Sequence, residues 1–196
     1  MQKKKKILII NGHPDPAPER FCAALAVAYQ EGAQAAGHEV RELKVGALDF
    51  PLIRDRKSFE YVDPPATIAA AQEQMIWADH LLIVHPLWLG AAPALLKGFF
   101  EQTFRYGFAL PRPEAGASRG QLAGRTARIV VTMGMPDFVY GLVFGGFGVR
   151  AMVRGILGIS GVKPVRRNYV GMVESMKPEQ RRAWLNRMRR LGGLAA

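Results

Sequence analysis

HLLIVHPLWLGAAPALLKG, residues His80–Gly98, joins an apolar run to an amphipathic segment through a short loop. The run His80–Val84 predicts a strand that is buried on both faces. The apolar spacing from Ala94 to Phe104, with Pro93 ahead of it, predicts a helix. A strand that passes through a loop into a helix is the repeating unit of parallel α/β sheets. In such sheets ligands bind beyond the carboxyl ends of the strands.

The rest of the chain repeats this alternation. Further strands are expected at Ile7–Ile10, Glu39–Val45, Arg128–Thr132 and Val162–Val170. Further helices are expected at Phe21–Ala36, Thr67–Trp77 and Glu179–Leu191, and an irregular stretch with Pro and Gly is expected to reach about Gly124. The pattern therefore predicts one doubly wound α/β domain over residues 1–196, with five parallel strands in the order 2-1-3-4-5.

Composition narrows the function classes. A single cysteine, Cys22, excludes an internal disulfide and a multi-cysteine zinc site, and the four histidines lack the spacing of metal ligands. No metal site is expected. The apolar run near the N-terminus is too short for a signal peptide, and no segment reaches transmembrane length, so a cytoplasmic location is expected.

The positive charge is concentrated in the C-terminal quarter. The formal net charge is +11, and residues 150–196 hold 11 Lys and Arg against two Glu. Such a region can contact an anionic membrane surface or a membrane transporter, or it can be a solvated basic helix. It lacks a stacking platform or recognition motif, so no nucleic-acid partner is expected.

Three loops are expected to meet in one crevice at the carboxyl edge of the sheet: Asn11–Cys22, Pro86–Ala92 and Thr132–Asp137. The first leads into a helix N-terminus, which favours a phosphate group. The other two offer backbone N–H groups and flat apolar walls, as a planar heterocycle needs. The glycine-rich fingerprints of dinucleotide-binding and P-loop proteins are absent. A flavin site is the remaining match.

On these motifs the chain resembles the NAD(P)H:quinone oxidoreductase family of flavodoxin-like flavoproteins. Relatives in that family include the ancillary reductase subunit of glutathione-gated potassium efflux systems and modulator of drug activity. Ile7–Pro14 resembles the first strand and its histidine, and Pro86–Leu89 the loop under the isoalloxazine. Pro93–Phe100 resembles the helix behind that loop, Val131–Gly134 the second flavin loop, and Tyr140 a tyrosine common in the family.

The resemblance implies a flavodoxin-like three-layer sandwich. It also implies an enzyme in which NAD(P)H reduces a bound flavin, FMN or FAD, and a quinone or similar acceptor takes the two electrons. A homodimer with active sites at the subunit interface is implied as well. The uncharged stretch 138–149 is then a candidate partner surface, and otherwise a buried helix. The alternative function is a flavodoxin-like regulatory subunit that docks on a membrane transporter.

The resemblance also implies the site residues. Tyr140 is the catalytic candidate, and the expected cofactor contacts are His13, Arg20, Phe21, Cys22, Pro86, Leu87, Trp88, Leu89, Thr132, Met133 and Gly134.

The chain departs from the family at several positions. Arg20-Phe21-Cys22 replaces a common Ser-Phe-Asn, so backbone amides would hold the phosphate, with Cys22 as a small packed residue. Gly146 stands where some quinone reductases have a histidine, and Trp88 alone replaces an aromatic pair. His85 ends its strand before the ligand loop and is expected to serve the structure.

Overall fold

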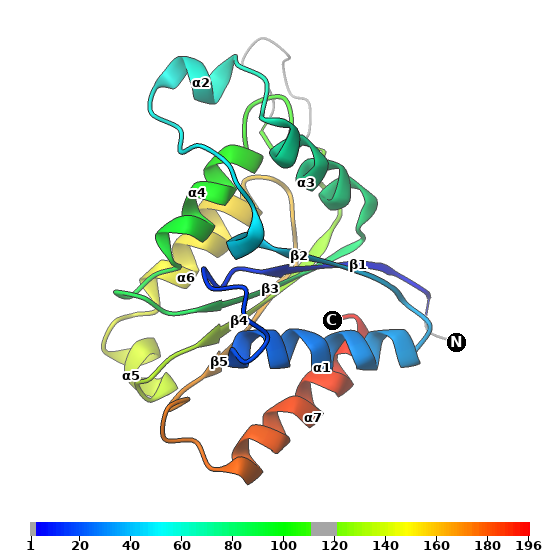
Figure 1. The fold of residues 1–196 in the computed structure, drawn as a ribbon, viewed down its shortest axis with the longest axis vertical. Helices are drawn as coiled ribbons and strands as arrows, with labels where there is room; N and C mark the ends of the chain where they lie inside the picture. The colour runs from blue at the N-terminus through cyan, green and yellow to red at the C-terminus, as the bar shows by residue number, and fades with distance from the viewer. Residues whose placement is uncertain (1–2, 111–120) are drawn as a thin grey trace.

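The computed structural model describes residues 3–110 and 121–196. Its strands form one parallel sheet in the order β2-β1-β3-β4-β5 (Figure 1). They are β1 (Lys6–Asn11), β2 (Glu39–Lys44), β3 (His80–Pro86), β4 (Thr126–Thr132) and β5 (Val165–Val170). The predicted strand number and order are confirmed, and β3 is buried at all seven positions, as a central parallel strand must be.

Helices cover both faces of the sheet (Figure 1), so the flavodoxin-like three-layer sandwich is confirmed. One layer consists of α1 (Phe21–Ala35) and α7 (Pro178–Leu194). The other is built mainly from α3 (Ala66–Trp77), α4 (Ala94–Thr103), α6 (Phe147–Ala151) and the π-helical segment η3 (Met152–Gly158). Shorter elements are η1 (Val45–Ala47), α2 (Arg56–Glu60) and α5 (Asp137–Leu142).

Several boundaries differ from the prediction. β5 begins at Val165 rather than Val162, directly after Pro164, because proline has no N–H to donate to a strand ladder. α7 begins at Pro178, behind Lys177 as its N-cap, and continues to Leu194. Part of the irregular stretch expected before Gly124, residues 111–120, lies outside the residues that the structure describes.

The uncharged stretch 138–149 is not a buried helix, and that alternative was wrong. It forms α5 and the start of α6, joined by a turn in which Gly145 and Gly146 have positive φ. Leu142, Val143 and Phe147 expose at least 70% of their surface. Each of these short helices buries one side chain, Tyr140 in α5 and Val149 in α6, and the other large apolar side chains of the stretch point to solvent.

Candidate functional site

The first loop, between β1 and α1, is shaped by its own polar side chains. His13 Nδ1 accepts the N–H of Asp15, Asp15 accepts the N–H of Ala17, and Arg20 Nε donates to Asp15 at 2.7 Å. The N–H of Ala17 and the Arg20 guanidinium hold the pKa of Asp15 below its usual value. Partial burial lowers the pKa of His13, so its imidazole is neutral at pH 7. The loop therefore holds a fixed shape, with Arg20 at the start of α1.

The N-terminus of α1 faces this loop without a side-chain cap. Arg20 is the N-cap in an extended conformation, and its side chain makes no capping bond. The first intrahelical acceptor is the Arg20 carbonyl, which binds the N–H of Ala24. The amides of Phe21, Cys22 and Ala23 thus precede the first helical bond and can bind an anion. No acidic side chain lies in the first turn to compete.

Cys22 links this helix to the end of β4. Its Sγ lies 3.3 Å from Thr132 Oγ1, and both residues are buried. Burial raises the pKa of the Cys22 thiol to about 11, so it stays protonated and unreactive at pH 7. Cys22 and Thr132, two predicted site residues that lie far apart in the sequence, are therefore in contact through the thiol and the hydroxyl.

The second loop, after β3, projects Trp88 and Leu89 outward. The N–H of Leu87 binds the Thr132 carbonyl at 2.7 Å, which ties this loop to β4. Trp88 and Ala91 exchange two backbone hydrogen bonds of 3.0 Å, forming a two-residue hairpin turn. The Trp88 side chain is half exposed, and its ring meets the His13 ring edge-on at 6.2 Å. An indole that is half open to solvent beside the first loop can wall a planar ligand.

Leu89 stores backbone strain at this turn. Its φ is +47°, and its side chain is fully exposed. A left-handed conformation at a non-glycine residue costs about 1–2 kcal/mol, and no burial of the Leu89 side chain compensates. Strain of this kind concentrates at ligand sites.

We expect Leu89→Gly to raise the free energy of unfolding by about 1 kcal/mol, because glycine adopts positive φ without a steric cost. Leu89→Ala keeps a Cβ in the same conformation and is the matched control, with little expected change. Urea unfolding of the three proteins measures both effects. A Leu89→Gly variant no more stable than Leu89→Ala would show that the turn is not strained.

The third loop, after β4, lies against the segment that follows β5. Met133 is buried, and its N–H binds the Val170 carbonyl at 2.9 Å. A Cβ added at Gly134 would lie 3.5 Å from the Glu174 carboxylate, which is ordinary contact. Close packing therefore does not require glycine at position 134. Met133 is buried, whereas Gly134 is exposed in the loop, so of the two only Gly134 is accessible to a ligand.

Tyr140 is buried between the second loop and α6. Its hydroxyl donates to the Gly90 carbonyl at 3.1 Å and accepts the N–H of Val149 at 3.3 Å. Gly146, in place of the family histidine, has a φ of +59°, and a Cβ there would point toward the Tyr169 hydroxyl and the Tyr140 ring. The contacts of Tyr140 support a positioning role for the hairpin turn. Its expected catalytic role stays a prediction.

His85, near the end of β3, supports the start of the second loop. Its Nδ1–H donates to the Pro86 carbonyl at 2.8 Å, and its Nε2 has no partner among the residues that the structure describes. The imidazole is completely buried, and burial lowers its pKa to about 4. A second proton would be buried without an acceptor, so His85 is neutral in the folded protein.

This burial makes the stability of the protein depend on pH. Above about pH 6.5, the ordinary pKa of histidine, His85 is neutral in both the unfolded and the folded protein. Between about pH 6.5 and pH 4 it is protonated in the unfolded protein only, because its pKa in the folded protein is about 4. Stability is therefore lost as the pH falls through this window, by about 1 kcal/mol from this residue between about pH 7 and pH 5.5. Urea unfolding of the parent and of His85→Gln at both pH values tests this. An equal pH slope in the two proteins would contradict it.

One residue near the site was missed by the sequence analysis. The Arg181 guanidinium lies 4.9 Å from the Phe21 ring centroid, and its Nη2 donates to the Val173 carbonyl at 2.6 Å. A side chain of the basic C-terminal helix thus reaches the first turn of α1. From the sequence it was treated as one arginine of the basic C-terminal quarter, as a candidate contact for an anionic partner or as part of a solvated helix, and was not placed at the flavin crevice. No local sequence pattern connects it with Phe21.

The described parts of the chain, residues 3–110 and 121–196, contain no group of three or more His, Cys, Asp or Glu side chains arranged to hold a metal ion. Within the same residues, no helix combines the length and apolar character needed to cross a membrane.

Comparison with known sequences places this geometry in context. Residues 5–191 match the Flavodoxin_2 family, described as a flavodoxin-like fold. The glutathione-regulated potassium-efflux system ancillary protein KefG of Escherichia coli is 29% identical over 142 residues, which cover 71% of this chain and 64% of that protein. The chain spans less than two thirds of the length of the curated relatives that match it first.

Comparison with solved structures agrees on the fold. An NAD(P)H:quinone oxidoreductase from Methanothermobacter marburgensis superposes with a TM-score of 0.81 at 23% identity, over 97% of this chain and 96% of that one. An FMN-dependent NADH-azoreductase from Bacillus anthracis, solved in complex with FMN, has a TM-score of 0.76 at 15% identity, over 97% of this chain and 100% of that one. At these identities the likeness establishes a shared fold.

Proposed function

This chain belongs to the Flavodoxin_2 family of flavodoxin-like proteins, and from that premise we propose that it is a cytoplasmic flavoprotein oxidoreductase. In this proposal two electrons pass from NAD(P)H through a bound flavin to a quinone or similar flat acceptor. The observation that carries it is that the half-exposed indole of Trp88 meets the ring of His13, in the loop that leads into the uncapped N-terminus of α1.

The residues at this edge fit a flavin. The free amides at the start of α1, with Arg20 beside them and Arg181 against Phe21, suit its phosphate. The half-exposed face of Trp88 suits its ring. The azoreductase of similar fold binds FMN, which makes FMN the first flavin to test and FAD the second.

When bound, the flavin supplies the redox chemistry, accepting a hydride from the nicotinamide and giving two electrons to the acceptor. The protein then has to bind and orient the flavin and its reaction partners, and to exclude water from the site. The α1 amides would fix the phosphate end, and Trp88 would cover one side of the ring. Tyr140 would hold the hairpin turn in place through Gly90, so the wall does not shift.

The exposed apolar side chains of α5, α6 and the turn between them support a homodimer. Leu142, Val143, Phe144 and Phe147 are each at least 49% exposed. A Cβ at Gly148 would lie 2.3 Å from the Gly90 carbonyl oxygen, so α6 begins directly against the hairpin turn. A second copy that covered this surface would therefore lie beside Trp88 and Leu89, as an active site at a subunit interface requires.

The decisive test of the function is spectroscopic. The purified protein should show a flavin absorption spectrum, or gain one with added FMN or FAD. Anaerobic NADPH or NADH should bleach it, and a benzoquinone should restore it. A protein that takes up neither flavin would contradict the proposal, as would a bound flavin that neither nicotinamide reduces.

A second candidate function is that of a regulatory subunit docked on a membrane transporter. The match to KefG, by its name an ancillary protein of a potassium-efflux system, favours it, as do the exposed arginines of α7. Co-sedimentation with anionic vesicles that is lost at high salt would support contact with a membrane surface. No binding at low salt would count against that contact.

A further inference from the structure

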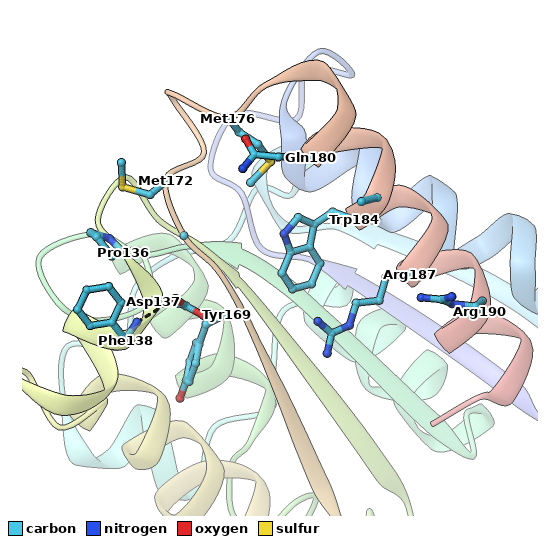
Figure 2. Close-up of a pocket in the computed structure, with 12 residues that line it drawn as sticks. Pro136, Asp137, Phe138, Tyr169, Met172, Met176, Gln180, Trp184, Arg187 and Arg190 are labelled. Carbon is cyan, nitrogen blue, oxygen red and sulfur yellow. Dashed lines mark hydrogen bonds between the residues drawn. The ribbon is translucent and has the colours of Figure 1, made fainter.

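A groove of about 740 Å³ lies outside the flavin crevice, between α5 and α7 (Figure 2). Trp184, Arg187 and Arg190 line it from α7, and Tyr169 lines it from β5. In Figure 2 β5 passes between the labelled side chains of α7 and those of Pro136, Asp137 and Phe138. The groove therefore lies beside the carboxyl-terminal end of β5, where Tyr169 and the following Gly171 and Met172 line it.

β5 ends the sheet. It pairs with β4 on one side, and the strand order places no described strand on its other side. Its Arg166 and Arg167 are exposed and, being consecutive, point to opposite faces of the sheet. A row of backbone N–H and C=O groups with no strand beside it is a template for another extended chain.

The side chains around this edge are strongly basic. Arg166, Arg167, Arg187 and Arg190 have no carboxylate partner among residues 3–110 and 121–196. Of the described residues that line the groove, Asp137 alone is acidic, and its Oδ1 accepts the N–H of Phe138. By contrast, the other edge strand, β2, carries both Glu and basic residues. Charge complementarity therefore favours an anionic occupant of the β5 edge.

The groove also offers apolar contact. The Arg187 guanidinium lies 4.8 Å from the Trp184 ring centroid, and Met172 exposes 44% of its surface. A chain lying along β5 would thus meet an indole that is already stacked against a positive charge.

We propose that the groove along β5 binds an extended, acidic segment of a partner protein, which adds to the sheet next to β5. Its backbone would pair with β5, and carboxylates at every second position would all lie on one face of the added strand, the face next to Arg187 and Arg190 of α7. A second copy of this chain is a poor occupant, because it would bring the same arginines face to face. This docking site does not depend on the flavin.

The test uses a fluorescein-labelled peptide of about eight residues in which Glu alternates with Val, long enough to span a strand. Fluorescence anisotropy at low salt should show binding to the full chain. A peptide with Lys in place of Glu should not bind. An acidic peptide with prolines in place of Val cannot pair as a strand, and its affinity should fall by about tenfold or more.

Two variants of α7 separate the groove from general charge. Arg187→Glu with Arg190→Glu should weaken the acidic peptide by about tenfold or more. Arg182→Glu makes the same kind of change on the same helix, where Arg182 is exposed and pairs with Glu179, and should stay within about twofold of the parent after its smaller change in net charge.

Other results would overturn the proposal. Equal losses in both variants would show attraction to net charge alone. Equal binding of the proline peptide would exclude strand pairing. A dimer in sedimentation velocity that the double variant abolishes would make a second copy the occupant. Anionic vesicles that bind through Arg187 and Arg190 while the peptide does not would make the groove a lipid site. Because anisotropy needs no electron donor, these outcomes are independent of the reductase assay.

Discussion

Trp88→Ala is expected to weaken flavin binding about thirtyfold, which corresponds to about 2 kcal/mol of lost stacking. The Trp88 side chain is half exposed, so its removal leaves little cavity, and the melting temperature should stay close to that of the parent. Titration of the apoprotein with FMN, followed by flavin fluorescence, measures the dissociation constant. Trp88→Phe should keep most of the affinity because it preserves an aromatic face.

The matched control is Tyr61→Ala. Tyr61 is another exposed aromatic residue, 62% accessible, in the segment between α2 and α3 and away from the three loops. Its loss should leave flavin affinity unchanged. If Trp88→Ala binds FMN as tightly as the parent does, Trp88 is not the wall of the flavin site, and the proposal loses the indole that supports it.

The fold could be predicted because its strongest signals are local. The run His80–Val84 has no polar alternation, which is the pattern of a strand covered by helices on both sides, and β3 is buried throughout. The short apolar run at Ile7–Ile10 marks the neighbouring β1 in the same way. Right-handed crossovers then leave few ways to order five parallel strands.

Part of the site could not be predicted, because it depends on contacts between distant segments. Arg181 reads as one arginine among many in a basic helix, and only the packing of α7 beside α1 brings it to Phe21. Composition also could not decide how 138–149 is placed. An uncharged run suits a buried helix or an exposed surface equally. The positive φ of Gly145 and Gly146 breaks the run into two short helices and leaves its side chains exposed.

Gly192→Ala is expected to lower the free energy of unfolding by about 3 kcal/mol, even after the gain of about 1 kcal/mol in helix propensity. A Cβ at Gly192 would lie 2.0 Å from the Tyr29 carbonyl oxygen. A Cβ at Gly32 would lie 1.9 Å from the Arg189 carbonyl oxygen, so the backbones of α1 and α7 touch at two points. Backbone atoms cannot move aside as a flexible side chain can, so the helices must separate.

The control for this change is Gly141→Ala, at a helical glycine whose added Cβ meets nothing within 4 Å. It should leave stability unchanged or raise it by up to about 1 kcal/mol. Urea unfolding compares the variants, and equal stabilities would show that α1 and α7 do not touch in solution.

Separation of the two helices would also draw Arg181 away from Phe21. We therefore expect Gly192→Ala to weaken FMN binding as well, although Gly192 lies in the last turn of α7 and Arg181 in its first. A variant that loses stability but keeps its full affinity for FMN would show that the start of α1 holds its shape without α7.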